Sequence, residues 1–262
     1  MSILDQLLAE QTKNICQQYK ATESEVGAAL RDALSQNAKL SELITNSTSL
    51  KDIYRTRLFK DFLKKTKKEI YYDLRTYKKA APNLEESHIS SRERAPYVDL
   101  LFAQIDGYLE QAETILDLGG GLFPVSFPFD RYPKLKNYVW VDRDKEASEL
   151  LKKAGLPKLT RQNFALGENP WHYYLPDNRT DFDFVFMLKL VPVLYRQQRE
   201  VLSHISKVPF RHALITGSKE AMVKKVDIEA REKKVIEKFI REAGWEIVKR
   251  IDLPNEFGYL VK

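Results

Sequence analysis

The sequence predicts an α/β fold in which a mostly parallel sheet is covered by helices on both faces and is preceded by a helical region. From Thr114 onward, short apolar runs alternate with amphipathic stretches, the pattern of strands interleaved with helices. The preceding residues show helical spacing instead. The last two apolar runs are joined without room for a helix, which adds an antiparallel hairpin at the C-terminal edge of the sheet.

The N-terminal region, residues 1–82, is predicted to be a helical domain. Its first eighty residues contain one glycine and no proline, and apolar residues such as Leu58, Phe62 and Ile70 recur at helical spacings. A proline at the end of the region breaks this pattern. We therefore predict a second domain over residues 83–262.

Six apolar runs in the second domain predict strands. In chain order they are TILDL, NYVWV, FDFVFML, HALIT, WEIVKRI and FGYLV. The last two, Trp245–Ile251 and Phe257–Val261, are separated by a short segment containing Pro254 and Asn255. They are predicted to form the antiparallel hairpin.

Composition limits the function classes. The chain has 262 residues, 43% of them hydrophobic, so it can bury a sizeable core, and its net charge of +6 permits a polyanionic partner. Cys16 is the only cysteine, which excludes an internal disulfide and a thiolate metal cage. Charged residues interrupt the first twenty positions and no run of about 20 apolar residues occurs, so we expect a soluble, cytoplasmic protein.

A glycine-rich loop follows the first apolar run. Ile115–Leu118 leads into the glycines 119–121, which allow a tight turn and close approach to a ligand. The next run ends at Asp142, whose carboxylate can accept hydrogen bonds from both hydroxyls of a ribose. Position 124 is proline rather than the glycine of a dinucleotide fingerprint, which favours a nucleoside cofactor. Two alternatives remain open: the glycines form only a tight connection, and Asp142 caps a helix beginning near Asp144.

The segment His88–Arg94, with the sequence HISSRER, precedes a predicted amphipathic helix. Ser90 and Glu93 have the spacing of a capping box, which is the ordinary structural explanation. It leaves His88 and Arg94 without a role. An arginine in the first turn of a helix opposes the helix dipole, so it is more useful beside a carboxylate such as that of a bound cofactor.

Several blocks of the sequence resemble the Arm/Rmt family of aminoglycoside-resistance methyltransferases. HISSRER resembles the family's HxSTxER segment, ILDLGGGLFP its ILDxGCGxxP loop, and FDFVFMLKLVPVLYRQQ its DxxxLLKxLPxLxxQ element. The tail PNEFGY is similar to the family's NELVY strand, and KKTKKEIYYDLRTYKK is similar in character to its basic N-terminal helix. The resemblance runs in order over roughly residues 55–262, and LKxxPxLxxQ is its most specific part.

This resemblance implies the Rossmann-like sheet of class I methyltransferases, S-adenosylmethionine as cofactor, and no metal. The implied reaction is methyl transfer to N7 of the guanine at position 1405 of 16S rRNA in the small ribosomal subunit, which confers aminoglycoside resistance. The residues implied to line the cofactor are His88, Arg94, Asp117, Gly119, Gly121, Asp142 and Leu188.

The chain departs from the family pattern at two places. Gly120 replaces the family's cysteine, a change expected to be chemically mild because that thiol is not thought to react. The loop after the fifth strand, PxKSLxGxxKGM in the family, reads SKEAMVKKVD over Ser218–Asp227. Since that loop faces the target in the family, this departure bears on the substrate more than on the reaction.

The implied reaction needs no general base, because guanine N7 carries a lone pair and no proton, and no catalytic acid or base is assigned. A guanine in folded RNA must be unstacked to reach a buried methyl group. Lys189, Pro192 and Tyr195 are predicted to form the lip of its pocket. In the ordinary alternative Pro192 starts a helix, Tyr195 packs and Lys189 is solvated.

Positive charge is concentrated between residues 51 and 80, where eleven Lys or Arg stand against four Asp or Glu. This segment is predicted to contact RNA phosphates through Lys60, Lys64, Lys67, Lys68 and Arg75. The ordinary alternative is a solvated helix face. Two rival functions remain: a methyltransferase for another RNA or a small molecule, and a non-catalytic RNA-binding or ribosome-assembly protein.

Overall fold

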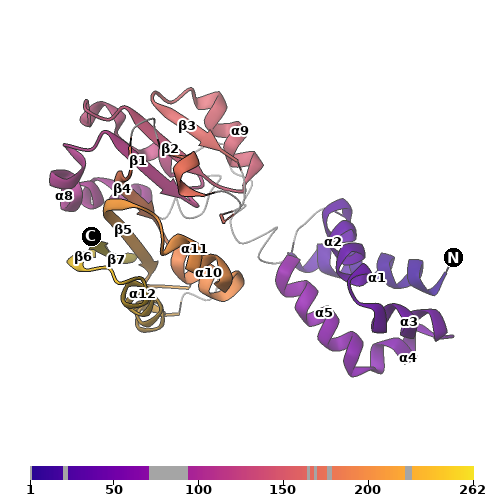
Figure 1. Ribbon diagram of the computed structural model, residues 1–262. Helices are drawn as coiled ribbons and strands as arrows, with labels where there is room; N and C mark the ends of the chain where they lie inside the picture. Colours follow the sequence, from indigo (N-terminus) through magenta and orange to yellow (C-terminus); the bar gives the residue numbers. More distant parts are fainter. Residues whose placement is uncertain are drawn as a thin grey trace. The chain divides into compact units, whose positions relative to one another are not determined.

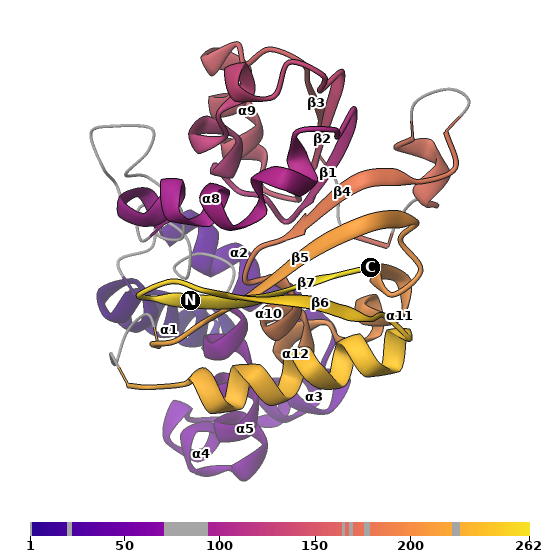
Figure 2. The same cartoon turned by 90° about the vertical axis from the view of Figure 1, so that its left-hand side faces the viewer.

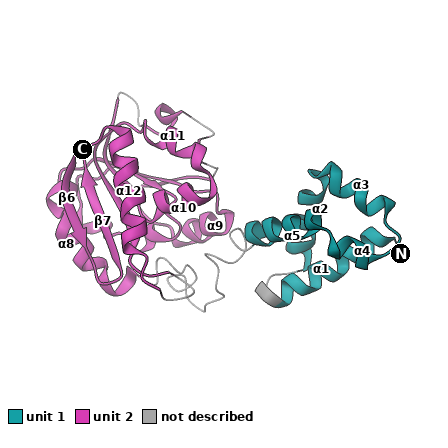
Figure 3. Cartoon of the chain, turned by 90° about the horizontal axis from the view of Figure 1, so that it is seen from below, with its two compact units in different colours: residues 1–80 teal, residues 81–262 magenta. Residues whose placement is uncertain are grey.

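The chain divides into two compact units, residues 1–80 and residues 81–262 (Figure 3). The computed structural model describes residues 2–19, 23–70, 94–163, 166–167, 170–175, 179–221 and 226–262. Within these ranges, no helix is both long and apolar enough to cross a lipid bilayer.

The first unit is helical throughout its described elements (Figure 1). These are α1 (Ile3–Tyr19), α2 (Glu23–Ser35), α3 (Ala38–Asn46), α4 (Leu50–Arg55) and α5 (Arg57–Ile70). Asn37 caps α3 by accepting a hydrogen bond from the Leu40 N–H, and Ser49 caps α4 through the Lys51 N–H. The helices share a buried core that includes Leu7, Leu34, Leu40, Ile44, Ile53 and Phe59. The predicted helical region is confirmed for these residues.

The second unit is built on a seven-stranded sheet with the strand order β3-β2-β1-β4-β5-β7-β6 (Figure 2). The strands are β1 (Thr114–Leu118), β2 (Asn137–Val141), β3 (Leu159–Gln162), β4 (Phe182–Met187), β5 (Phe210–Ser218), β6 (Ile247–Asp252) and β7 (Glu256–Val261). Strands β1 to β5 pair in parallel, whereas β7 pairs antiparallel with both β5 and β6. The predicted parallel sheet and C-terminal hairpin are therefore confirmed. The sequence did not reveal β3, because Leu159 is its single apolar residue.

Helices cover both faces of this sheet. They are α8 (Val98–Leu109), α9 (Lys145–Ala154), α10 (Leu190–Gln197), α11 (Leu202–Ile205) and α12 (Glu229–Ala243), with short 3-10 helices η2 (Ala95–Tyr97), η3 (Phe123–Ser126), η4 (Phe129–Arg131), η5 (Trp171–Tyr173) and η6 (Arg199–Val201). Helices α8 and α9 bury one face, and α10, α11 and α12 bury the other. Successive residues of β1 alternate between them: Ile115 joins the first core, and Leu116 and Leu118 join the second.

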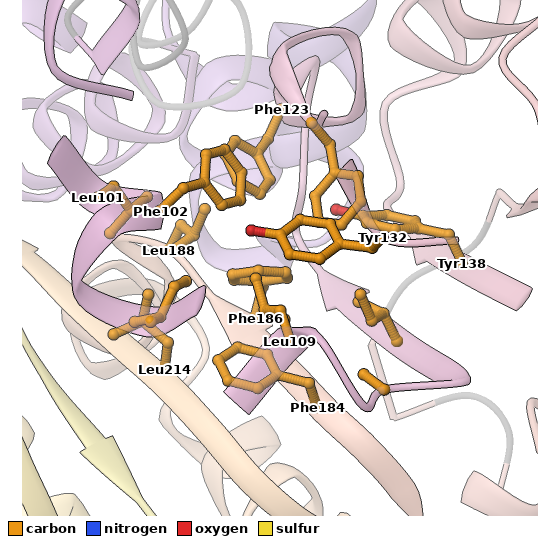
Figure 4. Packing of buried hydrophobic residues seen from close by; sticks show 14 of the residues in the cluster. Leu101, Phe102, Leu109, Phe123, Tyr132, Tyr138, Phe184, Phe186, Leu188 and Leu214 are labelled. Atoms are coloured by element: carbon orange, nitrogen blue, oxygen red, sulfur yellow. The ribbon is translucent and has the colours of Figure 1, made fainter. Parts of the chain in front are cut away.

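The core on the α8 side is rich in aromatic rings (Figure 4). Phe102 of α8 and Phe186 of β4 both contact Phe123 of η3, with ring centroids 6.2 and 5.2 Å from it. Such rings bury a large apolar area. Because Phe123 stands two residues after the glycine loop, this packing anchors the end of the loop to the sheet.

Candidate functional site

The glycine loop lies at the carboxyl ends of the parallel strands, the edge at which open α/β sheets bind ligands. Gly119 has a φ of +63°, and a Cβ there would lie 2.8 Å from the Leu190 Cδ1. Its N–H donates to the Val141 carbonyl at 2.8 Å, and the Trp140 indole N–H donates to the Gly121 carbonyl at 3.0 Å. The loop is thus held in place by the neighbouring strand β2, and the positive φ favours glycine at position 119.

Asp142 lies directly after β2 and beside this loop. Its Oδ2 accepts a hydrogen bond from the Gly121 N–H at 2.9 Å, and its Oδ1 accepts one from the Asp144 N–H at 3.0 Å. Helix α9 is capped by Asp144 itself, whose Oδ1 accepts from the N–H groups of Glu146 and Ala147. The alternative in which Asp142 is the cap is therefore wrong, and Asp142 remains at the edge of the candidate site.

Asp117 of β1 is a fully buried carboxyl group with an incomplete set of hydrogen bonds. Its Oδ2 accepts from the Tyr138 hydroxyl at 2.9 Å, whereas its Oδ1 has no partner among the described residues. Burial raises the pKa of Asp117 to about 7; the Tyr138 hydrogen bond opposes this, the charge of Asp142 adds to it, and Arg94 opposes it. A buried oxygen without a partner costs folding free energy. Such a group is typical of a site in which a ligand completes the hydrogen bonding.

Gly120 has no side chain, and the Asp117 carboxylate occupies the space that a side chain at position 120 would fill. A Cβ at position 120 would lie 2.1 Å from Oδ2 and 2.5 Å from Cγ of Asp117. The exchange of the family's cysteine for glycine, expected to be mild, is thus not neutral for the geometry of this chain. Any side chain at position 120 would force the carboxylate to move.

Arg94 and Lys189 share one carboxylate, that of Glu256. The Arg94 Nε lies 3.2 Å from Oε2 and its Nη2 lies 3.0 Å from Oε1, while the Lys189 Nζ lies 3.7 Å from Oε2. All three side chains are buried. Burial raises the pKa of Glu256, but the charges of Arg94 and Lys189 outweigh it and hold this pKa below its usual value.

Arg94 also lies beside the glycine loop, since its guanidinium carbon is 5.2 Å from the centroid of the Phe123 ring. The sequence led us to expect a cofactor carboxylate as its partner. The carboxylate that the structure gives it belongs to the protein, at the first residue of β7. A cofactor role for Arg94 remains a prediction.

The residues after β4 include the three that were predicted to form the lip of the guanine pocket. Lys189 is 8% exposed, with its ammonium 3.7 Å from Glu256, so the ordinary alternative of a solvated lysine is wrong. Its place at the lip of the guanine pocket stays a prediction. Pro192 is buried within the first turn of α10. The Tyr195 ring is flanked by Arg199 and Lys238, 4.6 and 6.0 Å from its centroid. These last two positions agree with the ordinary packing roles.

Leu188 is 8% exposed and belongs to the aromatic core that also holds Phe123 (Figure 4). It lies at the carboxyl end of β4, next to the strand that carries Asp117. That position is compatible with the predicted contact to the cofactor, which stays a prediction.

Helix α5 presents three lysines to solvent on one side. We call Lys60, Lys64 and Lys68 the α5 lysine stripe; all three are exposed, and Lys67 beside them is half-buried. The opposite side of the helix is buried through Phe59, Thr66 and Ile70. Two ion pairs on this helix join Arg57 to Asp61 and Lys65 to Glu69. RNA binding by the stripe stays a prediction.

Part of the predicted site lies outside the described residues. This applies to His88 and Arg75, to the capping box of Ser90 and Glu93, and to positions 222–225 of the loop after β5. The described ends of that loop are closed by a β-bridge between Glu220 and Asp227. Among the described side chains, no group of three His, Cys, Asp or Glu is arranged to hold a metal ion.

Two residues of the candidate site were not predicted from the sequence. They are Glu256, which pairs with Arg94 and Lys189, and Tyr138, which donates a hydrogen bond to Asp117. The available signal for Glu256 was an acidic residue at the start of a strand whose other members are apolar, EFGYLV, all of them buried. Tyr138 could not be selected from the sequence, because a tyrosine is ordinary in a buried strand. Its hydroxyl becomes informative only when Asp117 is seen to accept its hydrogen bond.

No protein-family model matches this chain. The 16S rRNA methyltransferase RmtF, solved with S-adenosyl-L-homocysteine, aligns with a TM-score of 0.58 at 14% identity, over 92% of this chain and 99% of that one. An rRNA methylase from Escherichia coli aligns with a TM-score of 0.57 at 15% identity, over 97% of this chain and 99% of that one. At these identities the likeness establishes the fold, and the chain has the α/β fold of class I methyltransferases.

Proposed function

We propose that this protein is an S-adenosylmethionine-dependent methyltransferase of 16S rRNA, of the kind that the Arm/Rmt resemblance implies. The observation that carries the proposal is the meeting of the glycine loop, the incompletely bonded Asp117 and Asp142 at one edge of the sheet. The fold shared with RmtF, which was solved with S-adenosyl-L-homocysteine, supports the choice of cofactor. The proposed target is N7 of the guanine at position 1405, in the cytoplasm, with aminoglycoside resistance as the result.

The residues present fit this cofactor. The buried Oδ1 of Asp117 can accept a hydrogen bond from the ammonium of a methionine moiety, because an ionised carboxylate has only acceptors. Asp142 has the position for ribose hydroxyls, and the glycine loop has no side chains that would keep a ligand away. When bound, S-adenosylmethionine supplies a methyl group on a positively charged sulfur.

Positioning is the main task left to the chain itself. Guanine N7 attacks with a lone pair and releases no proton, so the side chains need only orient the two reactants and exclude water. We propose that residues 83–262 carry this reaction and that residues 1–82 hold the RNA. The α5 lysine stripe suits that second role, because phosphate contacts fix the position of RNA without reading its sequence.

The first experiment measures binding of S-adenosylhomocysteine by calorimetry. Asp142→Ala should weaken it by the value of one or two charge-assisted hydrogen bonds, about 1.5 to 3 kcal/mol each. A matched control is Asp144→Ala, which removes the α9 cap two residues away and should leave the affinity unchanged. Equal affinity in wild type and Asp142→Ala would remove Asp142 from the site.

The second experiment identifies the product. Small ribosomal subunits are incubated with the protein and labelled S-adenosylmethionine, and methylated nucleotides are mapped by mass spectrometry. A host that expresses an active enzyme should resist kanamycin and gentamicin but not apramycin, which the family resemblance implies is unaffected.

The changed loop after β5 favours a second candidate, a methyltransferase for another RNA or a small molecule. It predicts cofactor binding without a methyl group at the proposed guanine. A non-catalytic RNA-binding or assembly protein would instead show no cofactor binding at all.

A further inference from the structure

We infer that Glu256 is a positioning residue for the proposed cofactor site: its carboxylate holds Arg94 beside the glycine loop and keeps it turned away from Asp117. The inference rests on the proposed function, because it concerns how Asp117 stays open to the cofactor.

Glu256 joins three separate parts of the second unit. It is the first residue of β7 and pairs with Ser218 at the end of β5. Its two oxygens accept hydrogen bonds from the Nε and Nη2 of Arg94, and Lys189 approaches from the end of β4. A bidentate arginine–carboxylate pair fixes the plane of the guanidinium as well as its distance. Arg94 therefore has one defined orientation in this site.

Thr216 of β5 adds to this arrangement. Its hydroxyl oxygen accepts a hydrogen bond from the Lys189 N–H at 2.9 Å, and the hydroxyl donates to the Glu256 carboxylate. Lys189 takes a left-handed backbone conformation, with a φ of +58°, directly before α10. The ends of β4 and β5 are thus tied to the same carboxylate that orients Arg94.

The charges explain why this orientation matters. Two cations share one anion in a buried cluster, and buried charges are costly unless they are paired. Among the described residues, the titratable groups that act on Asp117 are Tyr138, Asp142 and Arg94. Without Glu256, the guanidinium would gain most by turning to Asp117 and occupying its open Oδ1. The ammonium of the cofactor would then compete with an arginine of the protein for that oxygen.

The test compares two buried carboxylates. Glu256→Gln keeps the size of the side chain, but its amide nitrogen faces arginine donors and cannot replace the second oxygen. The matched control is Glu232→Gln, a carboxylate that is 3% exposed and pairs with Arg196 and Arg231, on α10 and α12. Both variants and the wild type are titrated with S-adenosylhomocysteine by calorimetry between pH 6 and pH 9, with the folded fraction followed by circular dichroism.

Glu256→Gln should weaken binding about tenfold at pH 8, which is ~1.4 kcal/mol. The pH at which the association constant for S-adenosylhomocysteine reaches half of its highest value should also be lower in this variant, because an arginine that turns to Asp117 lowers the pKa of that carboxyl group. Loss of packing alone would not move this midpoint. Glu232→Gln should show the wild-type affinity and midpoint even where it melts at a lower temperature.

Wild-type affinity and an unmoved midpoint in Glu256→Gln would overturn the inference. If that variant does not fold, Glu256→Asp takes its place, and wild-type binding by the shortened side chain would overturn the inference equally. A wild-type protein that does not bind S-adenosylhomocysteine would refute the proposed function first, so the two failures are distinguishable.

Discussion

The buried carboxyl group of Asp117 makes a specific prediction about stability. In the unfolded chain Asp117 titrates near its ordinary pKa of 3.8, whereas burial raises this pKa to about 7 in the folded protein. The folded state therefore binds the proton more tightly. As the pH rises between these values, the free energy of unfolding falls by ~4 kcal/mol in total, because each pKa unit is worth about 1.36 kcal/mol.

Asp117→Asn removes this pH-dependent loss while keeping the shape of the side chain. The amide NH2 places two N–H groups where the buried Oδ1 has no partner, and leaving a buried donor unpaired costs about 1 to 3 kcal/mol, a cost that does not depend on pH. The free energy of unfolding of Asp117→Asn, relative to that of the wild type, should therefore rise by ~3 kcal/mol between pH 5 and pH 8. Most of this rise should occur between pH 5 and pH 7. If the site binds the proposed cofactor, the same variant should bind S-adenosylhomocysteine more weakly.

Urea unfolding followed by tryptophan fluorescence measures this difference. All three tryptophans, Trp140, Trp171 and Trp245, lie in the second unit, so the signal reports the unit that contains Asp117. Asp183→Asn is the control. Burial raises the pKa of Asp183, but hydrogen bonds from the Glu113 and Thr114 N–H groups help to hold it below its usual value.

The stability lost in Asp183→Asn should therefore be the same at pH 5 and pH 8, because Asp183 is ionised in both states over this range. A pH-independent difference for Asp117→Asn as well would refute the argument that burial raises the pKa of Asp117.

Three further predictions follow from local geometry. Gly120→Ala should displace the Asp117 carboxylate and cost about 1 to 3 kcal/mol of stability, measured by urea unfolding. The same variant should bind S-adenosylhomocysteine more weakly, measured by calorimetry. Asp144→Ala should cost about 0.5 to 2 kcal/mol in the same unfolding assay through loss of the α9 cap. Replacing the α5 lysine stripe with glutamine should reduce the slope of log RNA affinity against log salt by roughly 2 to 3, and an unchanged slope would place the RNA on another surface.

Local patterns in the sequence were sufficient to predict most of the fold. The strands and the hairpin could be predicted because each is a short apolar run whose neighbours in sequence set its period and its limits. The glycine loop and Asp142 could be placed at the same edge of the sheet because each directly follows a predicted strand, and the carboxyl ends of parallel strands meet at one edge. Strand β3 escaped prediction because it lacks such a run.

The chemistry inside that fold depended on contacts between distant segments. Arg94 and Glu256 are 162 residues apart, and only the pairing of β7 with β5 brings the carboxylate to the arginine. The same carboxylate pairs with Lys189, which is buried rather than solvated as the ordinary alternative had it. The raised pKa of Asp117 and the need for glycine at position 120 likewise arise from burial and from neighbours across the sheet. Burial and ion pairing are properties of the packed chain, so the sequence determined where the candidate site lies and the tertiary structure decided which charges meet in it.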